Sequence, residues 1–192
     1  TRLKKYADSH SSILAVGSLI AKGTADNPII FTSTDQKFAD WGGIALLAGR
    51  SEIDYAIVEY SRNGIAVPSK RKDIVVRNTH VKDTMWGCFS IRGSNGLYEN
   101  NIAENCGHEG FDVEGNARII NNRIHKSHAG IIVFGGQPTL QNNIIQDKVQ
   151  VQSGNPRMID NKIVRTLRCN KKQAWIYENY VIPCEGKPYL RN

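Results

Sequence analysis

A small group of side chains near the middle of the chain combines the groups that acid–base chemistry on a sugar requires. Asp112 and Glu114 alternate with apolar residues, so both carboxylates are expected on one side of a strand. Arg92 belongs to a similar alternation earlier in the chain, and His108 lies just before the strand. Carboxylates and imidazoles can transfer protons, and a guanidinium can hold a substrate carboxylate. These residues are the candidate catalytic groups.

Neighbouring residues are candidates for contacting a ligand. His128 and Gln150 are polar groups in later segments. Aromatic faces can pair with sugar C–H surfaces and with cations, and the residues that offer them are Trp41, Trp86, Tyr98 and Phe134. The alternative is structural: the rings pack over the fold, Arg92 and Glu114 form a surface ion pair, and the histidines are ordinary turn residues. For Trp41, which opens an apolar segment, we expect packing.

A short phrase repeated along the chain positions these groups. Each copy has an apolar residue, a polar pair usually centred on Asn, and another apolar residue, and the copies recur roughly every twenty residues. They occupy 53–57, 74–81, 97–102, 119–124, 140–144 and 158–163. This period is typical of one turn of a parallel β-helix, a solenoid whose stacked coils bury a narrow core.

The Asn residues of this phrase have a structural role in that prediction. Asn tolerates the left-handed conformation of a sharp corner, and stacked amides can hydrogen-bond from coil to coil. We therefore interpret them as an internal corner ladder and not as ligand-binding groups: Asn78, Asn100, Asn101, Asn121, Asn122, Asn142, Asn143 and Asn161.

A second strand in each coil determines which residues face the core. Aligning these strands places two columns inward, namely Ile65, Phe89, Phe111, Ile131, Val149 and Val67, Ile91, Val113, Val133, Val151. Side chains alternate faces along a strand, so the residues between them point outward. The outward rows are Ser90, Asp112, Ile132, Gln150 and Arg92, Glu114, Phe134. Adjacent coils lie about 4.8 Å apart, so we expect Arg92 to contact Glu114 directly.

The repeat predicts one all-β domain, a parallel β-helix of about seven coils. Residues 1–12 are predicted to form an N-terminal capping segment, 13–164 the coils, and 165–192 a C-terminal cap or hairpin. Hydrophobic residues make up 40% of the chain, which suits a narrow core. No apolar stretch approaches the ~18 residues that span a membrane.

The charge balance favours an anionic partner. Lys and Arg number 25 against 18 Asp and Glu, for a net charge of +7. Acidic polysaccharide, nucleic acid and phospholipid all carry the opposite charge. The basic residues cluster in 2–5, 70–72 and 165–172, where solvated turns and protected sheet edges are the structural explanation.

The chain has four cysteines, which are compatible with disulfides. Cys169 and Cys184 bracket an aromatic segment outside the repeats, and we predict that this pair is bonded. Cys88 and Cys106 are predicted to be small buried residues. No CxxC or paired-His spacing accompanies them, so we expect no metal site.

Two segments carry a family resemblance. Gly-Thr-Ala-Asp-Asn-Pro-Ile-Ile-Phe-Thr-Ser at 23–33 and Trp-Gly-Gly-Ile at 41–44 look like the opening coils of many exported bacterial β-helix proteins. Over 13–164 the chain resembles the right-handed parallel β-helix proteins of the pectin-lyase-like superfamily. The resemblance implies a right-handed solenoid, a secreted or cell-envelope location and a polysaccharide partner. The charge suits an acidic polysaccharide but does not by itself choose among anionic partners. Nucleic acid is not the expected partner, and no cofactor is expected. The pattern indicates no particular oligomeric state.

The catalytic motifs of the superfamily's enzymes match this chain poorly. Pectate lyases combine several calcium-binding carboxylates with an Arg base, and here the outward carboxylates are few and dispersed. The Gly-His-Gly segment of polygalacturonases is only faintly similar to Gly107–Gly110. Alginate epimerases share Gly-Phe-Asp with 110–112, but Val113 and Glu114 replace the Pro and His that follow.

These observations leave three functional hypotheses. The leading one is polysaccharide binding on the exposed face without a diagnostic catalytic motif. The second is a lyase, hydrolase or epimerase of acidic glycans that uses Asp112, Glu114, Arg92 and His108. The third is a structural or protein-interaction module of a larger envelope or spike assembly.

Overall fold

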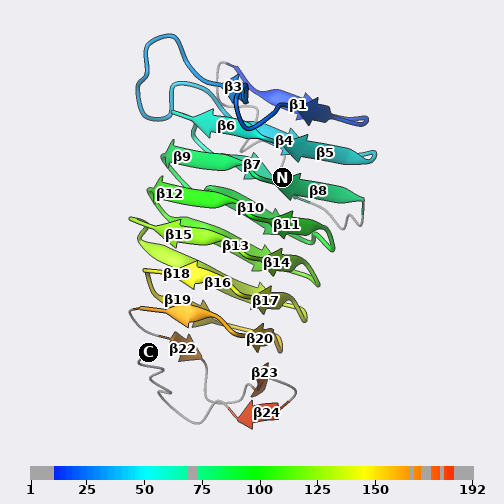
Figure 1. Cartoon of the computed structure of the whole chain (residues 1–192), viewed down its shortest axis with the longest axis vertical. Helices are drawn as coiled ribbons and strands as arrows, with labels where there is room; N and C mark the ends of the chain where they lie inside the picture. The colour runs from blue at the N-terminus through cyan, green and yellow to red at the C-terminus, as the bar shows by residue number, and fades with distance from the viewer. Residues whose placement is uncertain (1–10, 69–72, 165–166, 170–173, 178–179, 184–192) are drawn as a thin grey trace.

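The computed structural model describes residues 11–68, 73–164, 167–169, 174–177 and 180–183. Every regular element in these ranges is a β-strand, and the strands wind into a solenoid whose coils stack from β1 to β24 (Figure 1). Consecutive strands enter three different sheets in turn, so each coil contributes to each sheet. The predicted all-β parallel solenoid is therefore confirmed.

The first sheet, which we call sheet A, has eight strands, all parallel. They are β1 (Ile13–Ala15), β4 (Ile44–Leu46), β7 (Ile65–Ala66), β10 (Phe89–Arg92), β13 (Glu109–Glu114), β16 (Ala129–Gly135), β19 (Val149–Val151) and β22 (Leu167–Cys169). This sheet contains the second strands of the coils, for which the sequence predicted two inward-facing columns.

Sheet B has nine strands, of which β24 alone runs antiparallel to its neighbour β23. They are β2 (Ile20–Lys22), β5 (Ser51–Asp54), β8 (Ile74–Arg77), β11 (Leu97–Glu99), β14 (Arg118–Ile120), β17 (Thr139–Gln141), β20 (Arg157–Ile159), β23 (Ala174–Tyr177) and β24 (Tyr180–Pro183). The first half of each Asn phrase lies in this sheet.

Sheet C has seven parallel strands. They are β3 (Ile29–Phe31), β6 (Ala56–Glu59), β9 (His80–Thr84), β12 (Ile102–Cys106), β15 (Arg123–His125), β18 (Ile144–Ile145) and β21 (Lys162–Ile163). No helix long and apolar enough to cross a membrane occurs in the part of the chain that the structure describes.

The core is the narrow column between the sheets, and both predicted inward columns of sheet A are buried in it. Phe89 and Phe111 from adjacent coils stack with ring centroids 4.3 Å apart, and Tyr98 of sheet B meets both rings edge-on. The Tyr98 hydroxyl lies 2.8 Å from the Ser94 hydroxyl, so its polar end is satisfied inside the core. Trp41 is buried, as expected, and its indole nitrogen donates to the Glu59 carbonyl.

The two residues of each Asn pair at the corner between sheets B and C have different roles. The first members, such as Asn100 and Asn121, adopt positive φ and turn the chain. The second members are buried and form the ladder: the Asn101 backbone N–H donates to the side-chain oxygen of Asn122 at 2.9 Å, and Asn122 donates likewise to Asn143. The predicted ladder is confirmed, and one residue of each pair makes it.

A disulfide joins Cys88, just before β10 of sheet A, to Cys106, the last residue of β12 of sheet C. Both residues are buried, as predicted, but their pairing was not anticipated. Cys88 occupies the register position that Gly64, Gly110 and Gly130 occupy in other coils. A Cβ at each of these glycines would meet side chains of sheet C, so the two sheets approach closely at this corner.

Several predictions fall on residues outside the described part of the chain. The N-terminal capping segment lies almost entirely in 1–10, and Cys184, the predicted partner of Cys169, is also outside it. In the C-terminal region, β22 continues sheet A, and β23 and β24 form an antiparallel pair at the end of sheet B. The sequence indicated about seven coils, and the three sheets have eight, nine and seven strands.

Candidate functional site

Three of the four candidate catalytic residues, Arg92, His108 and Asp112, line a pocket on the outer face of sheet A, with a volume of about 160 Å³. We call it the arginine pocket. Its walls come from β10, β13, β16 and the turns that precede β7, β10 and β13. The lining residues are Asn63, Trp86, Gly87, Ser90, Arg92, His108, Glu109, Asp112 and Phe134.

An ion pair between neighbouring coils forms the centre of this pocket. The Arg92 Nε group lies 2.7 Å from each carboxylate oxygen of Asp112, and the Ser90 hydroxyl donates to Asp112 Oδ2 at 3.3 Å. We expected Arg92 to pair with Glu114, its neighbour in register. The expectation fails because the Arg side chain extends diagonally over β13 and meets the carboxylate of the adjacent row.

Burial and the ion pair both shift the pKa values of Arg92 and Asp112. Burial raises the pKa of Asp112 above its ordinary value, and the opposing hydrogen bond and charge of Arg92 do not cancel that effect. Burial by itself lowers the pKa of Arg92, but the Asp112 carboxylate outweighs it and raises that pKa. A raised pKa makes Asp112 a better candidate for a proton donor than an ordinary aspartate.

Phe134 reaches the same pair from the next coil. The Arg92 guanidinium carbon lies 4.0 Å from the centre of the Phe134 ring, a cation–π arrangement. Aligning the coils of the repeat placed Phe134 opposite Glu114, but in the structure Glu114 pairs with Gly135. The register shifts between Val113 and Glu114, and an irregularity of this kind redirects a side chain, here the phenyl ring.

His108 belongs to a row of rings in the turns before the strands of sheet A. The Trp86 and His108 ring centroids are 5.5 Å apart, and those of His108 and His128 are 5.8 Å apart. His108 Nδ1 also bonds to the Glu109 carboxylate at the edge of the arginine pocket. An imidazole held by a carboxylate can act as a general base, and the row of rings can also stack on a ligand.

Glu114 and Gln150 do not line the arginine pocket. Glu114 lines a separate pocket of about 340 Å³, with Gly93, Asn95, Gly115, Asn116 and Gly136. We call this the glycine pocket. Gln150 is half-buried and lies opposite Ile132, so a full strand separates it from Asp112.

Sequence reasoning missed some members of the arginine pocket, of which Glu109 is the most important. Glu109 is the first residue of β13 and is buried. Asn63 and Ser90 also line the pocket. Ser90 was recognisable, because it lies in the same outward row as Asp112. Glu109 was not, because the change of direction at Gly110 reverses the alternation of faces there.

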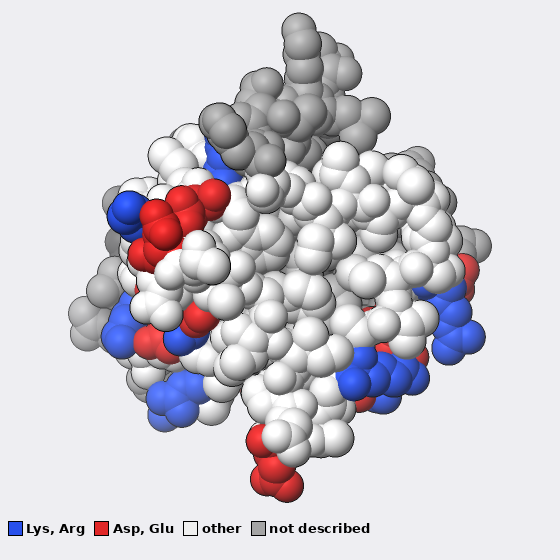
Figure 2. Space-filling model, turned by 90° about the horizontal axis from the view of Figure 1, so that it is seen from above, with Lys and Arg blue, Asp and Glu red and all other residues white. Residues whose placement is uncertain are grey.

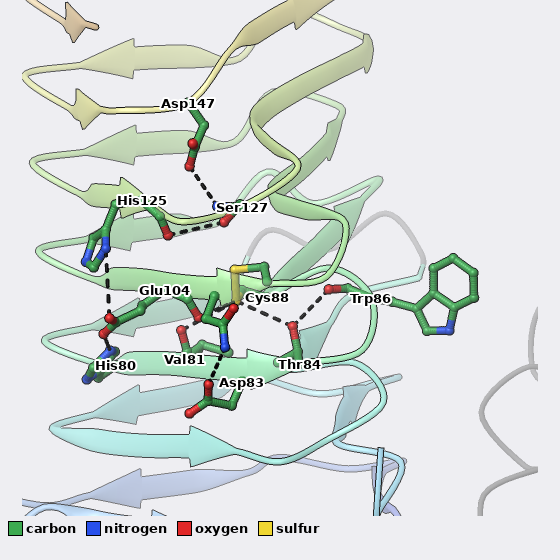
Figure 3. Close-up of a disulfide and its surroundings, with 12 residues drawn as sticks. His80, Val81, Asp83, Thr84, Trp86, Cys88, Glu104, His125, Ser127 and Asp147 are labelled. Carbon is green, nitrogen blue, oxygen red and sulfur yellow. Dashed lines mark hydrogen bonds and ion pairs between the residues drawn. A yellow bond between two sulfur atoms is a disulfide. The ribbon is translucent and has the colours of Figure 1, made fainter. Parts of the chain in front are cut away.

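A second cluster of titratable groups lies on the outer face of sheet C, on the other side of the disulfide from Trp86 (Figure 3). Glu104 is bonded to His80 Nε2 at 3.1 Å and to Lys126 Nζ at 2.9 Å, with His125 Nδ1 at 3.9 Å. The hydrogen bond from Lys126 lowers the pKa of Glu104. Burial lowers the pKa of His80. Neither cluster is arranged to hold a metal ion, and no such group occurs among the described residues.

Charged residues elsewhere on the described surface are partly paired. Seen along the solenoid axis, groups of acidic and basic side chains lie side by side at the rim (Figure 2). Lys22 lies 2.8 Å from Glu52, and Lys82 lies 2.9 Å from Glu59. Such pairs neutralise part of the surface charge locally, so the net positive charge alone does not locate a binding face.

Comparison with known proteins agrees with this geometry. A family model described as "Right handed beta helix region" matches residues 63–172, more than half of the chain. The match includes every strand that lines the arginine pocket and is consistent with the resemblance to pectin-lyase-like proteins. No curated protein and no solved structure matches the chain.

Proposed function

The chain belongs to the right-handed β-helix family, and from this premise we propose that it binds an acidic polysaccharide at the arginine pocket of sheet A. The family is defined by its fold and includes binding proteins and enzymes, so the proposal depends on the site. The pocket combines a cation, hydrogen-bonding groups and aromatic rings, which are the groups that carbohydrate recognition uses.

The geometry of Arg92 is the observation that carries this proposal. Its Nε is engaged by Asp112 and its guanidinium face by Phe134. The hydrogen bonds of the Arg92 side chain to the described residues are made by Nε, and the side chain is 36% exposed. Arg92 is thus fixed in place with its two terminal amino groups available for the carboxylate of a uronic acid.

The rings beside Arg92 support a sugar ligand and not an isolated anion. Trp86, His108 and His128 form an exposed or half-exposed row next to the charged pocket. A pyranose ring can stack on such a row while its carboxylate reaches the guanidinium. The disulfide supports an exported location, because disulfides persist mainly in oxidising compartments.

Binding to glycans tests the proposal. We expect the protein to bind soluble acidic polysaccharides such as polygalacturonate, alginate and hyaluronan, and to bind neutral dextran much more weakly. Arg92→Lys keeps a positive charge beside Asp112 but loses the planar fork, so affinity should fall about tenfold. Calorimetric titration at low and high salt measures both effects.

Arg118→Lys is the matched control, because Arg118 lies exposed on sheet B, away from the pocket. It should leave the affinity unchanged. If no acidic glycan binds even at low salt, the binding proposal fails and the third hypothesis, a structural or protein-interaction module, gains support.

Catalysis is a second candidate function, favoured by the placement of two acid–base groups in one pocket. Asp112, whose pKa burial raises, and the His108–Glu109 pair line the same walls. They can serve as proton donor and base in a lyase, hydrolase or epimerase of acidic glycans. The tests are the ultraviolet absorbance of unsaturated products and a reducing-end assay. Turnover that Asp112→Asn abolishes would support an enzyme, and binding without turnover would count against it.

A further inference from the structure

The two pockets on sheet A are neighbours along the same strands. Ser90 and Arg92 of β10 line the arginine pocket, and Gly93, the next residue, lines the glycine pocket. Asp112 and Glu114 of β13 divide between the pockets in the same way. Outward residues two positions apart are separated by about 7 Å, so the pockets are adjacent along the strand direction.

The chemistry of the glycine pocket is opposite to that of the arginine pocket. Glu114 is half-exposed; its charge acts on Arg92 through space, but the Arg92 Nε bonds to Asp112 instead. Asn95 and Asn116 each use the side-chain oxygen to accept a backbone N–H at 2.9 Å. Their amide nitrogens make no hydrogen bond within the described ranges, so these donors, with the Glu114 carboxylate, are available to a ligand.

Backbone without side chains forms the floor of the glycine pocket. Gly115 and Gly136 have positive φ, and a Cβ on Gly136 would collide with the backbone of Gly115 in the preceding coil. The turns therefore stack at close range and leave a smooth surface beside Glu114. The face of a pyranose ring can approach such a surface closely.

We propose that the two pockets are neighbouring subsites of one glycan site that runs along β10 and β13, across the solenoid axis. This inference rests on the proposed function. The arginine pocket takes a uronic acid, and the glycine pocket takes a neutral or amino sugar whose hydroxyl or amide groups bond to Glu114, Asn95 and Asn116.

Electrostatics gives the site its specificity for an alternating glycan. A second uronate in the glycine pocket would face the Glu114 carboxylate, and like charges at this range repel. A homopolymer of uronic acid must place such a unit there. A glycan in which uronic acid alternates with a neutral or amino sugar avoids the repulsion and gains hydrogen bonds to a charged acceptor.

Tetrasaccharides of the two classes test this inference. The probes are a hyaluronan tetrasaccharide, which alternates glucuronate with N-acetylglucosamine, and tetragalacturonate. We expect the wild type to prefer the alternating ligand. Glu114→Gln should weaken that ligand about tenfold, because the hydrogen bond then goes to a neutral amide oxygen and no longer to a charged carboxylate. The same variant should strengthen tetragalacturonate about threefold, because the repulsion is removed.

Two control variants test whether a change in affinity is specific to the glycine pocket and whether the glycan runs along the solenoid axis. Glu99→Gln makes the same change on the outer face of sheet B and should alter neither affinity. Gln150→Ala changes a residue of sheet A further along the solenoid axis and should also be neutral. Thermal unfolding checks that every variant is folded.

Different results would disprove the paired subsites and the proposed binding of acidic polysaccharide. If neither tetrasaccharide binds the wild type but Arg92-dependent binding of long polymers persists, the paired subsites are wrong and the function stands. If Gln150→Ala weakens binding while Glu114→Gln does not, the glycan runs along the axis and the inference is overturned. If nothing acidic binds at all, the proposed function itself fails.

Discussion

Two carboxylates on different faces of the solenoid meet similar partners and behave in opposite ways. Asp112 on sheet A and Glu104 on sheet C each contact a basic side chain from a neighbouring coil. The Asp112 side chain is 8% exposed and that of Glu104 is 24% exposed. Burial raises the pKa of Asp112, whereas the hydrogen bond from Lys126 lowers that of Glu104.

The difference follows both burial and the number of partners: burial raises the pKa of Asp112 despite its one guanidinium, whereas Glu104 keeps more water and has three basic neighbours. A carboxylate that loses most of its water holds its proton more tightly even beside a guanidinium. A carboxylate that keeps some water is stabilised in its charged form by nearby cations. On this criterion the sheet A cluster is the candidate for proton transfer, and the sheet C cluster is a surface ion-pair network.

Removing the disulfide should have the largest effect, because it links the strands that carry the two clusters. Cys88 and Cys106 are 18 residues apart in the chain. Replacing both with Ala should lower the free energy of unfolding by about 3 kcal/mol in the chain-entropy model. Urea unfolding with and without reductant measures this loss. A double variant as stable as the wild type would show that packing alone joins sheets A and C.

Breaking the ion pairs separately should reveal the next largest difference. Arg92→Ala leaves the buried Asp112 carboxylate without its partner and should cost about 2 kcal/mol of unfolding free energy. Lys126→Ala removes an exposed cation beside Glu104 and should change the stability little. Chemical denaturation of both variants compares the clusters directly. Equal losses would contradict the distinction drawn from burial.

The pH dependence of stability should have opposite signs at the two carboxylates. Because the folded-state pKa of Asp112 is raised, its contribution is most favourable below the ordinary value of 3.8 and is lost as pH rises through the folded-state pKa. Because the folded-state pKa of Glu104 is lowered, its contribution is present above the ordinary value of 4.5 and is lost as pH falls through the folded-state pKa.

Melting temperatures of two variants between about pH 3 and pH 7 test these signs. Asp112→Asn should remove the loss of stability that accompanies rising pH. Glu104→Gln should remove the loss that accompanies falling pH. Curves that change in the same direction in both variants would mean that the two environments are equivalent.

His80 should give the smallest effect of the series. Burial lowers its pKa, so its contribution to stability is present above the ordinary value of 6.5 and is lost as pH falls through the folded-state pKa. His80→Gln should flatten this part of the curve only slightly, since Glu104 partly compensates the charge of the protonated ring. An NMR titration of the His80 ring protons provides the direct measurement. A pKa above 6.5 would show that Glu104 dominates over burial.

Much of the fold could be predicted because the repeat registers each coil against the next. The inward column through Phe89 and Phe111 followed from alignment alone, since a shift by one residue would move every apolar side chain to the surface. The disulfide could not be predicted. Cys88 and Cys106 lie on different sheets. Their separation depends on how closely those sheets approach at the corner where other coils have Gly64, Gly110 and Gly130.

The site was only partly predictable, because register fixes where a backbone lies and not where a long side chain ends. Arg92 and Glu114 are paired in the sheet, yet the guanidinium reaches Asp112. The shift after Val113 moved Phe134 over Arg92, and one extra residue in β16 leaves no clear mark in the sequence. Trp86 and His108, which precede the strands in equivalent turns, do lie together.

The Asn ladder has a direction along the solenoid axis. The backbone N–H of Thr79 donates to Asn101 of the following coil, and Asn101, Asn122 and Asn143 each donate forward in the same way. A coil without its C-terminal neighbour would therefore lack the acceptor for this backbone donor. At this corner each coil depends on the coil that follows it in the chain.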